Sequence, residues 1–316
     1  MPDLVTLGEA MAVVRATAVG PPRPGAAAQL SFAGAESTVA IGVRRLGHSA
    51  RWIGRLGSDA FGDMILAALR AEDVAVDAVA RDADRPTGLL VRHRRTADRA
   101  AVAYYRTGGA GAAVGPHDVP ADVLPTARVL HLTGITPALG EQPRAAVEAI
   151  VAAARRARTR ITFDVNYRRR LWSEVEARPV LRRLVAGSAT VFAGAEEAAL
   201  VLDRPEPVDA VQLARGLAEL GPEEVVLKLG AAGALVLAGG DVARVPAVAV
   251  TAVDVVGAGD GFVAGYLSGL LDELPPAGRL ARGAVCGAFA VSTTGDWEGL
   301  PTRAELGLLT GPDVVR

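Results

Sequence analysis

The segment DVVGAGDGFVAG, residues 254–265, has the residue types and spacing best suited to chemistry. Gly257 and Gly259 precede Asp260 where a helical pattern begins. The first backbone amides of a helix have no partner within it, and glycines let a bound group approach them closely. Together with the helix dipole, these amides form a site for an anion. The segment therefore predicts an anion hole with a carboxylate, Asp260, inside it.

A carboxylate in that position can accept a proton from a hydroxyl while the amides hold a phosphoryl group. Positioning and charge stabilisation supply most of the catalysis in phosphoryl transfer. The alternative is that Asp260 only caps a helix and the glycines only permit tight packing, and this short motif does not decide between them. A dinucleotide fingerprint is excluded because Phe262 stands at its third glycine position. A P-loop is excluded because no Gly-Lys-Ser/Thr occurs, and Lys228, the only lysine, lies between leucines.

Composition narrows the class of protein. The 316 residues are 50% hydrophobic, which is enough for one large α/β domain. A net charge of −1 gives no reason to expect a nucleic-acid or membrane partner. Cys286 is the single cysteine and no His-x-x-x-His pair occurs, so neither a disulfide nor a protein zinc site is expected. Without a signal peptide or an apolar run of about 18 residues, we expect a cytoplasmic protein.

Apolar runs alternate with helical patterns from about residue 120 onward. Strands are expected at 127–135, 161–166, 190–195 and 224–230, with an amphipathic helix at 141–157 among them. This alternation predicts parallel βαβ units and a sheet covered by helices on both faces. Earlier in the chain, helices are expected within 35–49, with Ser37 as cap and Gly47 as terminator, and at 59–74. A further strand is expected at 245–250, directly before the glycine motif.

The region 87–107 has a different pattern. Two extended runs, 87–95 and 99–106, are joined by residues 96–98 and lack the continuous apolarity of the other strands. This predicts a hairpin with one solvated face. With residues 10–16 and 29–34 it should form a small sheet that stands off the main body as a lid, with residues 20–25 at its tip. We expect a single domain over residues 1–316.

Several segments of the chain resemble the motifs of one known family. The segment 254–267 resembles the C-terminal signature of ribokinase-like (PfkB) carbohydrate kinases, and 30–47 followed by 53–65 resembles their N-terminal signature. The motifs HLTGITPAL, FDVNYRRRLW and TGDWEGLP resemble the 2-keto-3-deoxygluconate kinase branch. The resemblance runs from about residue 4 to residue 306. It implies an α/β, ribokinase-like three-layer domain with a central, mostly parallel sheet and a small β-sheet lid.

The resemblance also implies roles for individual residues. Asp260 would be the catalytic base, and the backbone of Gly257, Ala258 and Gly259 would be the anion hole for the γ-phosphate of ATP. The implied nucleotide-binding residues are Asn166, Lys228, Gly230 and Gly233. For Lys228 the alternative is a salt bridge at a strand end.

On the substrate side the informative residues are basic. By analogy with the keto-acid branch, Tyr104, Arg106 and Arg168 should face the substrate, since arginine matches a carboxylate with two parallel hydrogen bonds. The alternative is that the arginines lie on solvated faces. The remaining substrate-binding residues implied are Gly34 and Ala35, which would shape the sugar pocket, Thr38, and Asp296, which would bind a sugar hydroxyl.

Three positions depart from the family pattern. Thr38 stands where asparagine is usual, Leu90 lies where the keto-acid branch usually has tyrosine, and Gly194 replaces the asparagine of a metal-associated Asn-x-x-Glu. Only Glu197 of that metal motif remains. Mg²⁺ would still accompany ATP, held largely by phosphates and water. A monovalent cation requirement stays open.

These observations favour a kinase that converts 2-keto-3-deoxygluconate to its 6-phosphate. A neutral-sugar kinase of the fructokinase or ribokinase type is the first alternative, although Glu9 followed by apolar residues disfavours it mildly. A non-catalytic sugar- or nucleotide-binding protein of the same fold is the second, and the presence of Asp260 disfavours it. Exposed lid strands tend to find partners, so we expect a homo-oligomer formed through them.

Overall fold

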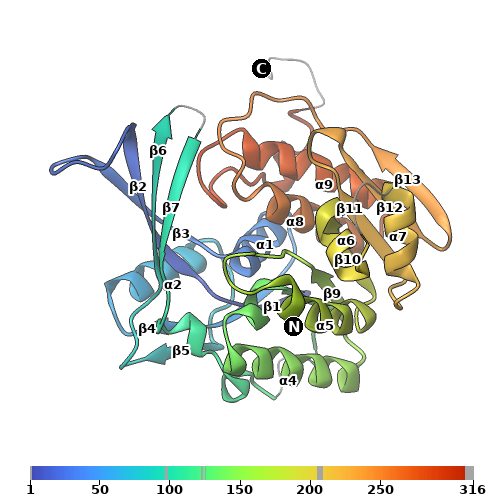
Figure 1. The fold of residues 1–316 in the computed structure, drawn as a ribbon, viewed down its shortest axis with the longest axis horizontal. Helices are drawn as coiled ribbons and strands as arrows, with labels where there is room; N and C mark the ends of the chain where they lie inside the picture. The colour runs from blue at the N-terminus through green and yellow to red at the C-terminus, as the bar shows by residue number, and fades with distance from the viewer. Residues whose placement is uncertain (1, 97–98, 122–123, 125, 205–208, 310–316) are drawn as a thin grey trace.

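The computed structural model describes residues 2–96, 99–121, 124, 126–204 and 209–309. Within these residues the strands form a nine-stranded sheet and a separate four-stranded sheet. Figure 1 shows the smaller sheet rising from one side of the main body. The predicted α/β architecture with a mostly parallel central sheet and a small second sheet is confirmed.

The main sheet is parallel over most of its width. Its order is β13-β12-β11-β10-β9-β8-β1-β4-β5, and only β12 and β13 run antiparallel to their neighbours. The strands are β1 (Leu4–Leu7), β4 (Ala50–Gly57), β5 (Val79–Asp82), β8 (Val129–Thr133), β9 (Arg160–Asp164), β10 (Thr190–Gly194), β11 (Glu224–Lys228), β12 (Ala234–Ala238) and β13 (Asp241–Val245). The parallel strands are apolar runs because both faces of the sheet are covered.

Helices cover the two faces as separate layers. Residues of α4 (Glu141–Ala157), α5 (Glu174–Ala186), α6 (Ala195–Leu202) and α7 (Ala210–Ala218) share one core with the first face. Residues of α1 (Ala35–Arg45), α2 (Ala60–Ala71), α8 (Ala258–Leu271) and α9 (Pro276–Val291) share the other core. In β1, Val5 belongs to the first core and Leu4 to the second, as the alternation of side chains requires. Short turns complete the described chain: α3 (Ile135–Ala138), η1 (Gly111–Ala113), η2 (Pro116–Asp118), η3 (Gly230–Ala232) and η4 (Arg303–Glu305).

The ends of α1 test the expected caps. The prediction of Ser37 as cap is wrong, because the N-cap is Gly34 and the Ser37 hydroxyl donates a hydrogen bond back to the Gly34 carbonyl. The prediction of Gly47 as terminator is confirmed: its amide bonds to the Arg44 carbonyl, and the His48 amide bonds to the Val43 carbonyl. These two bonds form a Schellman motif.

The four-stranded sheet, here called the small sheet, has the order β3-β2-β6-β7. Its strands are β2 (Met11–Val19), β3 (Ala28–Ala33), β6 (Leu89–Thr96) and β7 (Arg99–Tyr105). The β6–β7 hairpin forms as predicted, although residues 97–98 of its expected connection lie outside the described residues. Parallel pairing of β2 with β6 makes the sheet mixed. Met11, Val13, Ala33 and Leu90 form its own apolar cluster.

The prediction of a strand at residues 245–250 is wrong. Strand β13 ends at Val245, and residues 246–257 form an irregular segment that leads into α8. Pro246 explains the end of the strand, because proline has no amide to donate to a ladder. A loop, not a strand, therefore delivers the chain to the glycine motif.

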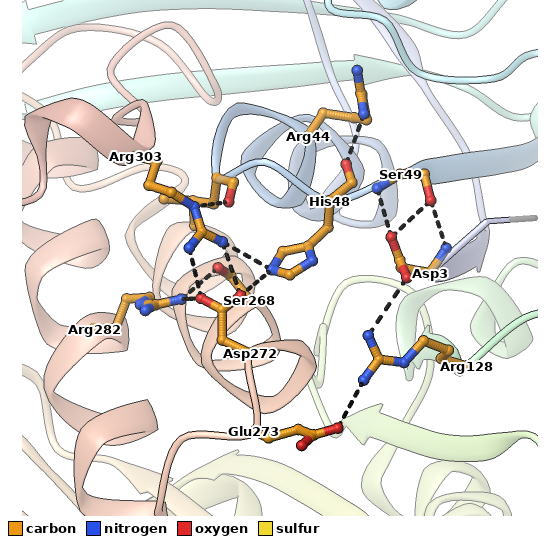
Figure 2. A network of polar contacts seen from close by, with 11 residues as sticks. Asp3, Arg44, His48, Ser49, Arg128, Ser268, Asp272, Glu273, Arg282 and Arg303 are labelled. Carbon is orange, nitrogen blue, oxygen red and sulfur yellow. Dashed lines mark hydrogen bonds and ion pairs between the residues drawn. The ribbon is translucent and has the colours of Figure 1, made fainter.

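The far end of α8 is fixed by a polar network (Figure 2). Asp272, the C-cap of α8, accepts a hydrogen bond from Arg303 at 3.0 Å and an ion-pair contact from His48 at 3.1 Å. Arg282 of α9 binds the same carboxylate, and Arg303 also donates to the Leu46 carbonyl at 2.7 Å. Burial opposes the charge, but the hydrogen bonds from the two arginines lower the pKa of Asp272 to about 2. The network therefore ties α8 to α9 and to the end of α1.

We predict that Asp272→Asn lowers the free energy of unfolding by about 1–3 kcal/mol at pH 7, because two arginines lose their anion.

The effect should depend on pH. The lowered pKa of Asp272 stabilises the fold above pH 3.8, the ordinary pKa of the carboxyl, and this stabilisation is lost as the pH falls through about 2. Urea titrations should show a constant difference between the two proteins near neutral pH that shrinks below about pH 4. The exposed Asp241→Asn is the control and should change stability by less than about 0.5 kcal/mol. Equal effects of the two substitutions would contradict the role of the network.

Candidate active site

A cavity of about 1890 Å³ lies where the small sheet meets the carboxyl ends of the parallel strands. Its lining includes Glu9 after β1, residues 166–171 after β9, Gly194 at the end of β10, and Lys228 at the end of β11. The small sheet contributes Met11, Ala33, Leu90 and residues 102–104. Ligands of parallel α/β sheets bind at this edge because the loops that follow the strands converge there.

Helix α8 begins at this cavity. Its N-cap, Gly257, has φ +77°, and a Cβ on it would lie 2.2 Å from the Asp296 carbonyl oxygen. Only glycine fits here, so the helix starts directly against the backbone of Asp296. No side chain of the described residues caps the helix, and Gly257, Gly259 and Asp260 all line the cavity. The uncapped first turn gives this wall of the cavity a positive potential.

Asp260 lies in the first turn of α8. Burial raises the pKa of its carboxyl to about 6, and the negative charge of Asp164 adds to this effect. Lys228, Arg168 and a hydrogen bond from Asn166 act in the opposite direction. A carboxyl with this pKa is mostly ionised at neutral pH and still basic enough to accept a proton.

Lys228 and Asp164 form an ion pair behind Asp260. The Lys228 Nζ lies 2.6 Å from Asp164 Oδ2, and Asp164 is 1% exposed. Burial opposes the charge of Lys228, but Asp164, Glu197 and Asp260 together raise its pKa above the ordinary value. The strand-end salt bridge expected as an alternative for Lys228 is therefore present, and Lys228 also lines the cavity.

Asp164 was not among the residues singled out from the sequence. It ends β9 inside the run ITFDVN, and a lone carboxylate in a strand that is expected to be buried is the signal that could have found it. Its Oδ1 is buried without a hydrogen-bond partner among the described residues. Asp164 is not among the cavity-lining residues, so it acts on the site through its charge, which raises the pKa of Asp260, and not through contact with a ligand.

Glu197 was expected near a metal ion. Its Oε1 accepts the Tyr167 amide at 2.9 Å and its Oε2 accepts the Gly194 amide at 2.7 Å, so the carboxylate holds two of the loops that line the cavity. Two oxygens offer about four lone-pair sites, so further contacts remain available. Among the described residues, no group of three or more His, Cys, Asp or Glu side chains is arranged to hold a metal ion.

Most of the residues predicted to bind the substrate line the same cavity. Gly34, Ala35, Tyr104, Arg106, Arg168 and Asp296 all line the cavity. Gly34 is required by a close approach, because a Cβ on it would lie 2.5 Å from the Glu9 carbonyl oxygen. The guanidinium of Arg106 lies 5.8 Å from the Tyr104 ring centroid. Arg168 is exposed in the cavity wall and donates weakly to the Tyr167 carbonyl at 3.4 Å.

Arg106 has a partner that the sequence did not reveal. Its Nη2 binds the carboxylate of Glu9, which is 4% exposed and lies two residues after the end of β1. Burial raises the pKa of Glu9, while the charge of Arg106 opposes that rise. Arg106 therefore reaches the cavity with part of its charge already compensated.

Two further carboxyl groups in the cavity wall have raised pKa values. Burial raises the pKa of Asp296 to about 7, helped by the charge of Asp260. Burial also raises the pKa of Glu36 to about 7, against hydrogen bonds from Thr133 and Thr136. Asp296 is thus able to donate or accept a hydrogen bond near neutral pH, as recognition of a hydroxyl requires.

The structure does not bring every expected residue to the cavity. Thr38 is fully buried within α1, so its side chain is closed off from a substrate. Gly233 forms the turn into β12, and Gly230 begins the short turn η3; neither lines the cavity. Ala258 is also absent from the lining, although Gly257 and Gly259 on either side of it are present. Leu90 and Gly194, the other departures from the family pattern, both line it.

The fold and the site together define a sugar kinase, and the comparison with protein families agrees. The model for the pfkB family carbohydrate kinases matches residues 1–303, and the chain belongs to this family. No helix of the described residues is long and apolar enough to span a membrane.

Individual members of the family with similar sequences include two enzymes and one solved structure. The chain is 36% identical to the 2-dehydro-3-deoxygluconokinase of Bacillus subtilis (strain 168) over 312 residues, covering 96% of this chain and 94% of the relative. It is 35% identical to the 2-dehydro-3-deoxygluconokinase of Thermoproteus tenax over 313 residues, covering 96% and 93%. The crystal structure of a PfkB protein from Polaromonas sp. JS666 is 36% identical with a TM-score of 0.87, covering 97% and 99%.

The electrostatics of Asp260 predict a pH dependence. The kcat/KM for the sugar should fall below about pH 6, because a protonated Asp260 cannot accept the hydroxyl proton. Lys228→Gln removes a charge that lowers the Asp260 pKa, so the acidic limb should move up by about one pH unit. Release of ADP, followed at about pH 5–8.5, measures both limbs. Arg215→Gln, an exposed charge on α7, should leave the limb in place. A limb that does not move in the Lys228 variant would contradict this electrostatic account.

Proposed function

We propose that this sugar kinase transfers the γ-phosphoryl group of ATP to 2-keto-3-deoxygluconate, or to a closely related keto-acid sugar, and forms the 6-phosphate. The observation that carries the proposal is Asp260, a carboxyl with a pKa of about 6 in the uncapped first turn of α8, beside cavity-lining arginines. The two relatives described above support the proposal, because both are named as 2-dehydro-3-deoxygluconokinases.

In this mechanism Asp260 accepts the proton of the sugar hydroxyl as the oxygen attacks the γ-phosphorus. One P–O bond forms to the sugar, the P–O bond to the leaving ADP breaks, and ADP keeps that electron pair. The amides of Gly257, Ala258 and Gly259 stabilise the negative charge on the transferring group. Asn166, whose side chain lowers the pKa of Asp260, would orient that carboxylate.

The nucleotide would lie along the loops that follow β9, β10 and β11. Lys228 and Asn166 line this part of the cavity and are available to its phosphates. Gly230 and Gly233 would act through the shape of the loop before β12. Mg²⁺ neutralises phosphate charge when bound, and we assign it mainly phosphate and water ligands. Glu197 would contribute at most one carboxylate.

Selectivity for an acid would come from the arginines. Arg168 is exposed in the cavity wall, which suits a bidentate bond to a carboxylate. Arg106 gives one nitrogen to Glu9 and retains other N–H groups, because a guanidinium has five donors. Glu9 would hold Arg106 in one direction, and Tyr104 would pack beside it.

One observation favours a neutral sugar instead. The carboxylate of Glu9 already compensates Arg106, which leaves less unopposed positive charge on the substrate side. A neutral-sugar kinase of the fructokinase or ribokinase type is therefore the second candidate.

We also propose a homo-oligomer formed through the small sheet. Its order leaves β3 and β7 as edges, and Val19, Leu30 and Tyr105 are each more than half exposed on it. Unpaired edges and exposed apolar side chains together favour pairing with a second copy. Light scattering of the purified chain decides between a monomer and an oligomer.

We predict that Asp260→Asn lowers kcat by about 10²–10⁴-fold with little change in the KM values, because the amide cannot accept the proton. Steady-state ADP release and calorimetric titration with ATP and sugar measure the two effects. The control is Asp241→Asn, an exposed carboxylate on β13, which should retain full activity. Undiminished turnover by the Asp260 variant would remove the assigned base.

We predict that Arg168→Gln raises KM for keto-acid sugars by about tenfold or more and changes KM for neutral hexoses by less than about threefold. The reason is that only the acid loses a charged partner. A panel of keto-acids, fructose and ribose, assayed with wild type and variant, measures the split. Neutral sugars that outperform the keto-acids by orders of magnitude in the wild type would favour the second candidate.

A further inference from the structure

An ion pair joins the small sheet to the segment before α8. Arg92 of β6 binds Asp254 through Nη2 and Oδ1. The two residues are 8% and 5% exposed, and neither lines the cavity. A buried pair of this kind is costly to form and strongly destabilising to break, so it fixes the two segments relative to each other.

Asp254 has further partners in the loops around the start of α8. Its Oδ1 accepts the Val256 amide at 3.2 Å, and its Oδ2 accepts the Gly295 amide at 3.4 Å. The first bond shapes the turn that leads to Gly257, and the second holds residue 295 next to Asp296. Because Gly257 rests directly on the Asp296 carbonyl, both bonds determine where the first amides of α8 lie.

A second contact supports the same arrangement. Arg94, also in β6, donates from Nη2 to the Val253 carbonyl at 2.6 Å. The amides of Val253 and Asp254 in turn bond to the Val291 carbonyl, at 2.7 Å and 3.2 Å. The segment 253–254 is thus held between the end of α9 and the small sheet.

The register of β6 connects these contacts with the cavity. Leu90, Arg92 and Arg94 are two residues apart, so they lie on one face of the strand. Leu90 lines the substrate side of the cavity. The same strand face therefore meets the substrate with one side chain and holds the loop before α8 with the next two. Asp254 is bonded to the Gly295 amide, next to Asp296 in the cavity lining. The charge of Arg92 lowers the pKa of Asp296, and the charge of Asp254 raises it.

We propose that Arg92 is a positioning residue for phosphoryl transfer: through Asp254 it sets the backbone of the anion hole at Gly257–Gly259, so the hole is complete only when the small sheet is seated. This inference rests on the anion hole of the proposed function. It assigns the small sheet a part in catalysis beyond covering the substrate. It also explains why a buried ion pair stands at a position where a hydrophobic contact could join the small sheet to the segment before α8 at lower cost.

The test compares wild type with Arg92→Gln, Arg92→Lys, Asp254→Asn and the Arg92→Gln/Asp254→Asn double variant. The measurements are kcat and both KM values from ADP release, with the best sugar of the wild type, and the thermal unfolding midpoint. The matched control is Arg279→Gln, which breaks another largely buried pair, with Glu224 at the opposite end of the sheet. It should lose thermal stability and keep kcat.

We expect Arg92→Gln to lower kcat by about tenfold or more and to change KM for the sugar by less than about threefold. Arg92→Lys, which keeps the charge, should recover much of kcat. The double variant should lose less than the product of the two single effects, because it leaves no unpaired buried carboxylate. If Arg92→Gln does not fold, the double and lysine variants supply the comparison, and kcat below wild type with unchanged KM supports the proposal.

Two results overturn the proposal. In the first, the folded Arg92 variants keep the wild-type kcat and lose about as much thermal stability as the Arg279 control. The Arg92–Asp254 pair would then be purely structural. The other is a change confined to KM for the sugar, which makes the small sheet only a substrate wall. Either result alongside an inactive Asp260→Asn enzyme leaves the proposed function intact. A fully active Asp260→Asn enzyme overturns the proposed function, whatever the Arg92 variants do.

Discussion

Two carboxylates, Asp164 and Asp260, lie at the carboxyl edge of the main sheet. The positive charge of Lys228 offsets the repulsion between them. Asp164 takes the ammonium at 2.6 Å, and the same charge lowers the pKa of Asp260 against burial and against Asp164. The result is one carboxyl group with a pKa of about 6 at the start of an uncapped helix. Without the cation, Asp260 would hold its proton more tightly, because the charge of Lys228 lowers the pKa of that carboxyl.

The fold supplies this arrangement through the ends of its elements. Strands β9 and β11, which lie on either side of β10 and run parallel to it, deliver Asp164 and Lys228 to the same edge of the sheet. Helix α8 approaches from the other layer, with its first turn at the cavity and its last turn held by the Asp272 network. A helix fixed at both ends keeps its first amides in place, which preorganisation of an anion site requires.

The small sheet shows how selectivity and catalysis can share one element. Its strands bring Leu90 and Tyr104 to the cavity, and the chain after β7 brings Arg106 to Glu9. The proposed role of Arg92 extends this sharing to the phosphate side. Membership of the pfkB family establishes a sugar kinase, and these contacts are where the identity of the sugar would be decided.

The sequence alone determined the parallel sheet, the helix after the glycine motif and part of the cavity lining, because apolar period, glycine spacing and family motifs are local properties. It did not place the end of β13, which Pro246 decides through a missing amide, nor the burial of Thr38 inside α1. The Lys228–Asp164 and Arg106–Glu9 pairs join residues far apart in the chain, and no local pattern specifies such partners. Only the packing of strands and loops brings these charges together, and burial then sets their pKa values.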